Sequence, residues 1–546
     1  MLTPPVFLLL ASLHFAVGAL VCACFQSWTL IIFPSLLGFL LGALVLSGNC
    51  CPFEGSRRFP SLVLCLVLLV LPAFGFFYTS LRQVRASDKD LARFAGKHVY
   101  IDAAVESCLP LRNGTTKRFT CQVKNVAIKR ERRFEVIKCD GTTLLFIRKS
   151  SPFFEKLNRK SHFRCLCRVA SIADLERDGM QGYANYLKRM GVTSLSYLDG
   201  GRSFHFLPDE KTSSAALQIA DAITDWTEAQ RGRLISAHIR NLGSDIGSLL
   251  TAMVLGERAV GLNSDLLTSF RAVGLSHVLA ASGFNLTVVT LSTHWVCRVL
   301  GLSAIPTNCL SFAMMSVFVL FAGNSSSVVR ASLMCALAIA CSSLGRRVKI
   351  EGLLASALLI CTIVDPLSVA DPGFQLSYVA VSGIVFLVAP IADLFKEIVP
   401  NRWLRMFLDC LLTVSVAQAC VLPLQFFYFR QIGLLFLPAN LLASIVVTPV
   451  TVAGFASSLI LLVCPPGVFA VPFHFLSMLL DWFAAIPLRF LVWVVSGLSS
   501  CPGSVLNVPQ IGAWLVFLYY LLLVVLSFEV LARLRAYSDR RRKEAD

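Results

Sequence analysis

The stretch whose residue types and spacing best suit a functional role is residues 274–285, which read GLSHVLAASGFN and begin an apolar segment. Its small and polar residues with candidate roles are Ser276, His277, Ser282, Gly283 and Asn285. Ser276 and His277 do not suit a nucleophile pair, because neighbours on a helix point to different faces. Either Ser282 and Gly283 break the helix and turn backbone groups toward a polar path, or the small residues pack helices closely. Residue types alone favour neither interpretation.

Ionisable and amide side chains within or beside apolar segments form a second group. The ionisable residues are Arg330, Asp365, Asp371, Asp409, Asp481 and Arg489, and the amides are Gln418, Gln425, Gln431 and Asn440. Charges in a membrane are costly, so such residues usually face the bundle interior, a partner or water. A structural Arg–Asp pair near the surface is the alternative. The amides suit either a hydrated path or hydrogen bonds between helices.

Basic residues with aromatic neighbours mark a third region, between Arg82 and Leu207. It holds 25 Lys and Arg against 12 Asp and Glu, a net charge of +13, so we expect a polyanionic partner such as nucleic acid or anionic lipid. The candidate nucleic-acid-binding residues are Lys117, Arg118, Lys124, Arg130, Arg132, Arg133, Arg148, Lys149, Phe119 and Phe134. Charges on phosphates and rings on bases would make a single-strand binding face. The alternative for the rings is a barrel core.

Signatures of several enzyme classes are missing from the sequence. The eight His residues include no H-x-H pair of a metallo-β-lactamase site, and no G-x-x-x-x-G-K-[ST] loop for ATP is present. The absence of a C-x-x-C pair argues against structural zinc. We therefore expect no catalytic residue, metal or cofactor, and an energy source in another subunit or a gradient. Five cysteines lie in the basic region, where their spacing predicts no disulfide pairing: Cys108, Cys121, Cys139, Cys165 and Cys167.

Composition identifies the elements that must position these residues. Of 546 residues, 56% are hydrophobic and 15% are charged, and the mean hydropathy is +0.71, whereas soluble domains carry about 25% charged residues. Apolar runs of about 20 residues match the hydrocarbon core of a bilayer. This excludes a soluble enzyme and predicts a polytopic α-helical membrane protein with about 12 spans. They lie near residues 6–25, 28–48, 60–80, 276–297, 303–322, 328–344, 351–365, 375–393, 406–428, 432–463, 468–496 and 509–532, and the 432–463 stretch, with Pro438 and Pro449, is a candidate for two broken halves.

Basic loops predict the orientation of these spans. Arg57 and Arg58 follow the second span, and short basic loops stay in the cytoplasm. The loops at Arg346 and Arg402 and the basic C-terminal tail also fall inside if the later spans cross nine times. Both termini are then cytoplasmic, and residues 83–275 are extracytoplasmic.

Residues 83–207 are predicted to form an inserted extracytoplasmic all-β domain. Runs rich in β-branched and aromatic residues occur at 98–105, 118–128, 133–139, 143–147 and 162–172. The dipeptides Asn113-Gly114 and Asp140-Gly141 are turn signals between them. Five short strands suit a small OB-like barrel, with a helical piece near residues 180–189. An Ig-like sandwich is the alternative.

The other boundaries follow from the same patterns. Residues 1–82 are predicted to hold three transmembrane helices, 251–533 the main transmembrane bundle and 534–546 a basic cytoplasmic tail. Residues 208–250 form a connecting amphipathic helix, with Ile219, Ile223 and Trp226 on one face. That helix lies on a membrane surface, packs against the bundle, or serves only as a connector.

Several motifs, in this order along the chain, resemble the signature of the ComEC/Rec2 competence family. They are Gly182-Tyr183 with Tyr186-Leu187, Leu255-Gly256-Glu257-Arg258, Phe270-Arg271, residues 274–283, Val329-Arg330-Ala331, Gly345-Arg346, Asp365-Pro366, Asp371–Ser377 and Pro438-Ala439-Asn440 with Pro449. These blocks cover about residues 180–450. Their combination is far more specific than any single block.

The resemblance implies a channel that moves single-stranded DNA across the bacterial cytoplasmic membrane during natural transformation. The basic domain would receive DNA, and the bundle would form the path. The residues implied in the path or the family motif are Ser276, His277, Ser282, Gly283, Asn285, Arg330, Asp371, Gly373, Gln375, Ser377 and Asn440. Implied partners are single-stranded DNA, membrane lipids, a DNA receptor, and a separate motor ATPase and nuclease, and a homo-oligomer is allowed.

Two departures from the family pattern bear on these expectations. Asn285 stands where family members usually have a His, and the sequence to Asp546 contains no C-terminal metallo-β-lactamase-like domain. We therefore expect a form of the family without catalytic activity of its own. The alternatives are a transporter or flippase for an anionic envelope precursor or lipid, and a scaffold that only docks envelope partners.

Overall fold

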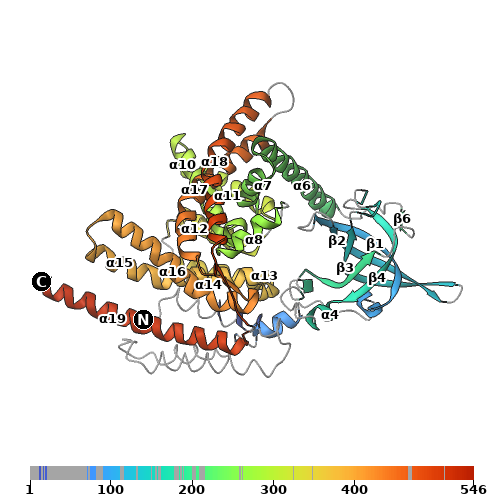
Figure 1. The fold of residues 1–546 in the computed structure, drawn as a ribbon, viewed down its shortest axis with the longest axis horizontal. Helices are drawn as coiled ribbons and strands as arrows, with labels where there is room; N and C mark the ends of the chain where they lie inside the picture. Colours follow the sequence, from blue (N-terminus) through green and yellow to red (C-terminus); the bar gives the residue numbers. More distant parts are fainter. Residues whose placement is uncertain are drawn as a thin grey trace. The chain divides into compact units, whose positions relative to one another are not determined.

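The computed structural model describes residues 12, 13, 16, 17, 19, 20, 71, 74–81 and 90–545, apart from 111–115, 131–132, 149, 154–155, 158–160, 178–183, 185–186, 189, 199–203, 208–214, 257–259, 261, 324, 347–348, 465–469 and 510. The chain divides into a unit of His14–Trp226 with Thr362–Asp371 and a unit built mainly of Thr227–Cys361 and Pro372–Asp546. Figure 1 shows that strands dominate the first unit and helices the second. The predicted spans 6–25, 28–48 and 60–80 lie almost entirely outside the described residues.

The first unit contains a closed β-barrel. Its strands are β1 (His98–Pro110), β2 (Thr116–Arg130), β3 (Arg133–Arg148), β4 (His162–Ser171), β5 (Val192–Leu198) and β6 (Phe204–Leu207). Their order is β1-β2-β3-β5-β4-β6, and an additional β1–β4 pairing closes five of them into a ring. The β3–β5 pair is parallel, and the other barrel pairs are antiparallel. The described strands thus form one continuous sheet, not the two sheets of a sandwich.

Alternation along the strands builds the barrel core. Ile101 of β1, Phe119 of β2, Leu145 of β3 and Phe163 of β4 are fully buried in one cluster, because every second side chain of a strand points to the same face. A second cluster, outside the barrel, joins the sheet to α4 (Ile172–Arg177) and to Ala184 and Leu187. Residues 184, 187 and 188 are the described helical part of the predicted piece at 180–189.

The prediction of a turn at Asp140-Gly141 is wrong. β3 runs through both residues as one strand, so the two predicted strands 133–139 and 143–147 are halves of it. The dipeptide lies at a bulge, where the β2–β3 register shifts between Val123 and Asn125. Gly141 has a φ of +147° and lies against Asp90, which explains why a turn-type residue stands inside a strand. Asn113-Gly114 lies outside the described residues.

The second unit is helical. Its elements are α6 (Ala215–Leu242, shared with the first unit), α7 (Ser244–Leu255), α8 (Ser264–Ala272), α9 (Ser276–Leu279), α10 (Gly283–Val299), α11 (Ala304–Phe321), α12 (Ser326–Ser343), α13 (Ile350–Val364, shared with the first unit), α14 (Pro372–Gly383), the π-helix η6 (Ile384–Val388), α15 (Ala389–Ile398), α16 (Arg402–Phe429), α17 (Phe436–Val463), α18 (Ala470–Ser499) and α19 (Ala513–Ala545), with a small pairing of β7 (Gln431–Gly433) and β8 (Val505–Asn507). The short helix η5 (Pro366–Ala370) belongs to the first unit. Among the described residues, six helices are long and apolar enough to cross a membrane. The protein is therefore mostly helical and carries an N-terminal β region.

The helices confirm some predicted interruptions and correct others. The predicted span 276–297 is broken, because α9 ends at Leu279 and α10 begins at Gly283. The predicted two halves of 432–463 are wrong, because α17 runs unbroken with Pro449 inside it. Within the predicted connecting helix 208–250, the structure has α6, which ends at Leu242, and the start of α7 at Ser244. Ile219, Ile223 and Trp226 are exposed on α6.

Candidate functional site

A row of outward-facing side chains crosses the barrel. The register places Arg118 of β2 opposite Phe146 of β3, which in turn lies beside Tyr197 of β5. Arg168 of β4 lies opposite Tyr197, and His98 of β1 lies opposite Arg168. The Phe146 and Tyr197 rings are stacked, with centroids 5.2 Å apart and planes 14° apart, and Tyr197 is 44% exposed. We call these five residues the aromatic–basic row.

The chemistry of this row suits a single-stranded nucleic acid. The register places an arginine on each side of the stacked rings, of which Tyr197 is exposed and Phe146 packs in part against the cluster at α4. Charges for phosphates therefore lie on strands next to an exposed ring for a base. The sequence argument named Arg118 but missed Phe146, Tyr197 and Arg168 as one set. Their association depends on pairing between β3 and β5, which are far apart in the sequence.

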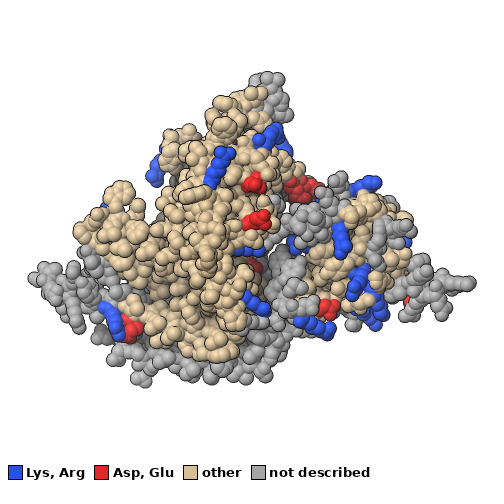
Figure 2. Space-filling model, in the orientation of Figure 1, with Lys and Arg blue, Asp and Glu red and all other residues tan. Residues whose placement is uncertain are grey.

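The other predicted basic residues of the barrel are more scattered. Lys117 and Lys124 are half-buried on β2, and Arg148 is exposed on β3. Figure 2 shows Lys and Arg side chains over the barrel. The register pairs two further predicted residues at the ends of β2 and β3, Arg130 and Arg133. Their side chains, and the whole of Arg132 and Lys149, lie outside the described residues.

The prediction that Phe119 stacks on bases is wrong. Its ring is fully buried inside the barrel, so it cannot present a face to a base without unfolding the domain. The side chain of Phe134 lies outside the described residues. The barrel-core alternative for the Phe119 ring is therefore confirmed.

An ion pair on the outside of the barrel spans the strand pair that closes it. Asp102 of β1 and Arg164 of β4 are direct cross-strand partners, and the carboxylate accepts from both Nε and Nη2 of the guanidinium, the latter at 2.6 Å. This hydrogen bond raises the pKa of Arg164 above its ordinary value. A bidentate pair has fixed geometry, so it sets the register at the closure.

Four cysteines with described side chains lie in the barrel. They are Cys121, Cys139, Cys165 and Cys167, and all four are buried. Burial is the main reason that the pKa of Cys165 lies well above its ordinary value, which keeps this thiol protonated and unreactive.

In the helical unit, residues 274–285 show both features considered for them: the helix breaks between α9 and α10, and the small residues at the break pack closely against a neighbouring helix. Ser282 caps α10, and its hydroxyl accepts from Asn285 N at 3.4 Å. A Cβ at Gly283 would lie 2.9 Å from the Cβ of Ala331, so the break also packs closely against α12. Ser276 and His277 are exposed at the start of α9.

Asn285 has a structural role at the position where the family usually has a His. It is 2% exposed, and its Nδ2 donates to Met253 O at 2.7 Å. This bond joins α10 to α7. The Asn285 amide donates this hydrogen bond, and unlike a His side chain it does not titrate.

Arg330 of α12 is the most unusual charge in the helical unit. It is 4% exposed, and its Nη1 donates to the carbonyl of Ser377 on α14 at 3.2 Å. Its guanidinium carbon lies 5.3 Å from the centre of the Tyr378 ring. Among the described residues it forms no ion pair, and its Nε has no hydrogen-bond partner. The predicted Arg–Asp pair is therefore wrong for this arginine.

Other predicted path residues join neighbouring helices around Arg330. Ser377 and Ser327 hydroxyls are 3.1 Å apart between α14 and α12, and Tyr428 of α16 donates to Oε1 of Gln375 at 2.8 Å. The remaining members are more peripheral: Asp371 ends the η5 turn, Gly373 is exposed at the start of α14, and Asn440 donates only to Phe436 O within α17.

A buried polar network that the sequence argument missed joins α6, α17 and α18. Nδ1 of His238 lies 3.0 Å from both carboxylate oxygens of Asp481, and Nε2 lies 3.0 Å from the hydroxyl of Ser458. Asn241 Nδ2 donates to Asp481 Oδ2 at 2.7 Å. His238 and Asp481 are completely buried. Since 243 residues separate them, no local sequence pattern links them.

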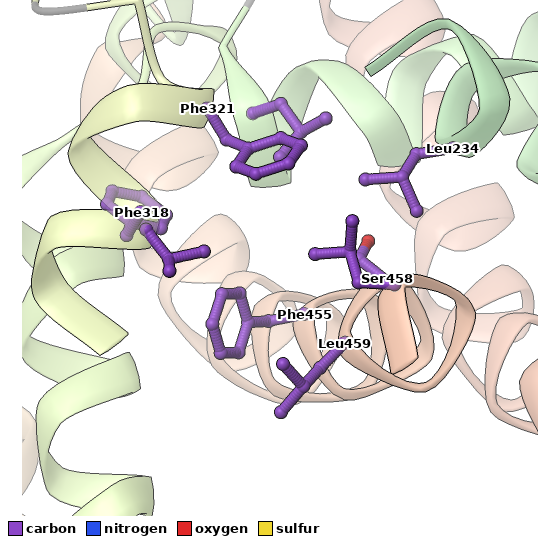
Figure 3. Close-up of a pocket in the computed structure, with 9 residues that line it drawn as sticks. Leu234, Phe318, Phe321, Phe455, Ser458 and Leu459 are labelled. Carbon is purple, nitrogen blue, oxygen red and sulfur yellow. The ribbon is translucent and has the colours of Figure 1, made fainter. Parts of the chain in front are cut away.

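Ser458 also lines a small apolar pocket. Figure 3 shows Ser458 with Leu459 and Phe455 of α17 opposite Phe318 and Phe321 of α11. Ser458 is the one polar residue of the lining. The network therefore borders an apolar space, which suits a structural role for its hydrogen bonds.

These features define a multi-pass membrane protein with a buried cationic centre, and comparisons with known proteins identify its family. Residues 253–533 match the family model described as Competence protein. The chain belongs to this family and is a ComEC/Rec2-like competence protein.

A more specific comparison is with one curated relative. The chain is 25% identical over 253 residues, 46% of its length, to ComE operon protein 3 of Bacillus subtilis (strain 168). The match covers 31% of that relative, so the chain spans less than a third of it. No solved structure matches the chain.

Proposed function

We propose that this protein carries single-stranded DNA across the bacterial cytoplasmic membrane during transformation. The family match over residues 253–533 carries the proposal, because it includes the six helices among the described residues that are long and apolar enough to cross a membrane. The broken α9–α10 segment and buried Arg330 lie in the same region. Backbone irregularity and buried charge at membrane depth are typical of transport paths.

In this proposal the barrel is an OB-like domain that receives the strand outside the cytoplasm. The order β1-β2-β3-β5-β4, closed on β1, supports this assignment, because OB folds are five-stranded Greek-key barrels. The aromatic–basic row is the proposed contact surface. Residues 83–275 would be extracytoplasmic and both termini cytoplasmic.

The proposal also includes partners. A DNA receptor would deliver DNA, a separate nuclease would degrade one strand, and a separate ATPase would supply force. We propose no catalytic activity for the chain itself.

Deleting the gene from a transformable host tests the proposal. Transformation by a chromosomal marker should fall to background and return when the gene is restored. Unchanged transformation combined with an envelope or growth defect would contradict DNA transport and favour transport of an anionic lipid or precursor.

Changes in the aromatic–basic row should weaken DNA binding by the full-length protein. We expect Y197A to lower affinity for a dT oligonucleotide by about 5- to 150-fold, because stacking contributes roughly 1–3 kcal/mol per base. The double variant R118Q/R168Q should reduce the slope of log affinity against log salt by about 1.4, for two lost phosphate contacts. Fluorescence anisotropy at several salt concentrations measures both.

Arg177 provides the control for charge alone. It is exposed on α4, lies outside the row and pairs with Asp174. R177Q should leave affinity within about twofold of wild type, since one screened surface pair contributes little. Equal losses in R177Q and the row variants would mean that the row is not the contact surface.

A further inference from the structure

The buried guanidinium of Arg330 has donors without acceptors. A guanidinium has five N–H donors and stays charged, yet within the described part of the chain the side chain of Arg330 makes one hydrogen bond, to Ser377 O. Its Nε is buried without a partner. Burying a charge without a counter-charge is strongly unfavourable, and the Tyr378 ring face compensates only part of it. Such an arrangement has a place for an anion.

A second positive feature lies against the same guanidinium. Nη2 of Arg330 would be 3.5 Å from a Cβ placed on Gly283, the first residue of α10. The first N–H groups of a helix have no partner within it, and the helix dipole favours negative charge there. α10 has 17 residues, enough for a full dipole. A Cβ on Gly283 would also lie 2.9 Å from the Cβ of Ala331, so the glycine allows the start of α10 to pack directly beside Arg330.

We propose that Arg330 and the N-terminus of α10 form a binding site for one phosphate group. This inference rests on the proposed function: the phosphate is that of a DNA strand, and it is taken up one group at a time as the strand passes. The planar fork of an arginine matches two phosphate oxygens, and helix N–H groups take a third. Between phosphates, the guanidinium rests on Ser377 and Tyr378.

Since Arg330 is 4% exposed, phosphate reaches it only when α12 and α14 separate locally. A site that is occupied briefly and then closes again agrees with transport, because a bound group must also leave. A site with a purely structural role would instead keep its bound anion permanently.

Thermal unfolding of the full chain in maltoside micelles tests the site. These micelles contain no phosphate, so inorganic phosphate can be compared with chloride at equal ionic strength. Wild type should unfold about 1–4 °C higher in phosphate, because a ligand that binds the folded state stabilises it. R330M should lose this shift. Without phosphate, R330M should unfold at the wild-type temperature or above, because the variant removes an unpaired buried charge.

The control is R298M, which removes an exposed arginine from the last turn of α10, at the opposite end of that helix from the proposed site. It should keep the phosphate shift. An equal shift in R330M, or failure of R330M to fold, would overturn the proposal, the second by showing that Arg330 is structural.

Two further arms identify the source of the phosphate. A dT oligonucleotide with ordinary phosphodiesters should give the Arg330-dependent shift, whereas the uncharged methylphosphonate analogue should not. If added phosphatidylglycerol gives the shift and the oligonucleotide does not, the site binds a lipid headgroup and the DNA assignment is wrong.

The proposed phosphate site and the proposed function can be rejected independently of each other. Loss of transformation on gene deletion with no Arg330-dependent shift would reject the site and keep the function. An Arg330-dependent phosphate shift in a protein whose deletion leaves transformation intact would reject the function.

Discussion

Replacing His238 with Ala should strongly destabilise the helical unit. The variant leaves the carboxylate of Asp481, which is completely buried, with Asn241 as its remaining side-chain donor. Leaving a buried polar group without its hydrogen-bond partner costs about 1–3 kcal/mol or more, a large part of the stability of a folded domain. We expect the unfolding midpoint in detergent to fall by roughly 5–15 °C.

Two variants separate the network from general effects of substitution. His474 is exposed on α18, the same helix as Asp481, so H474A should unfold at the wild-type temperature. The double variant H238A/D481A should unfold above H238A, because it leaves no buried charge without a partner. If H238A matches wild type, the network does not stabilise the unit.

A methyl group at Gly433 should have the second-largest effect. A Cβ there would overlap the carbonyl oxygen of Ala272 and lie 2.8 Å from the nitrogen of Gly274. Both obstacles are backbone atoms, so no side chain can turn away to make room. G433A must therefore push β7 away from the α8–α9 loop, which costs about 1–3 kcal/mol or more.

This loop leads directly into the α9–α10 break, so the substitution should also impair transport. We expect G433A to lower the unfolding midpoint and reduce transformation at equal protein abundance. Gly497 of α18 is the matched control, because a Cβ there meets no atom within 4 Å. G497A should be as stable as wild type or slightly more, since Ala favours a helix. Equal behaviour of the two variants would contradict the close approach at Gly433.

Much of the architecture follows from local pattern in the sequence. Apolar runs predicted the helices, because each segment must satisfy its own backbone in a membrane. Strands β1, β2 and β4 were predicted from runs rich in β-branched and aromatic residues. A break at Ser282-Gly283 was one of two interpretations that the small residues left open. In each case the physical cause lies within about 20 residues of the chain.

The errors and omissions have a different physical origin. The Asp140-Gly141 signal failed because the register between β2 and β3 tolerates a bulge at a glycine beside Asp90. The aromatic–basic row and the His238–Asp481 contact depend on pairing between distant segments, which no local pattern encodes. Phe119 was predicted to stack on bases, but its ring is buried and belongs to the barrel core.

The most direct test of DNA transport follows fluorescently labelled DNA in cells that carry or lack the gene. With the protein present, label should reach the cytoplasm and resist external nuclease. Without it, we predict that label still binds the cell surface and stays outside the cytoplasmic membrane. Entry of label into the cytoplasm of the deletion strain at the wild-type rate would contradict the central claim.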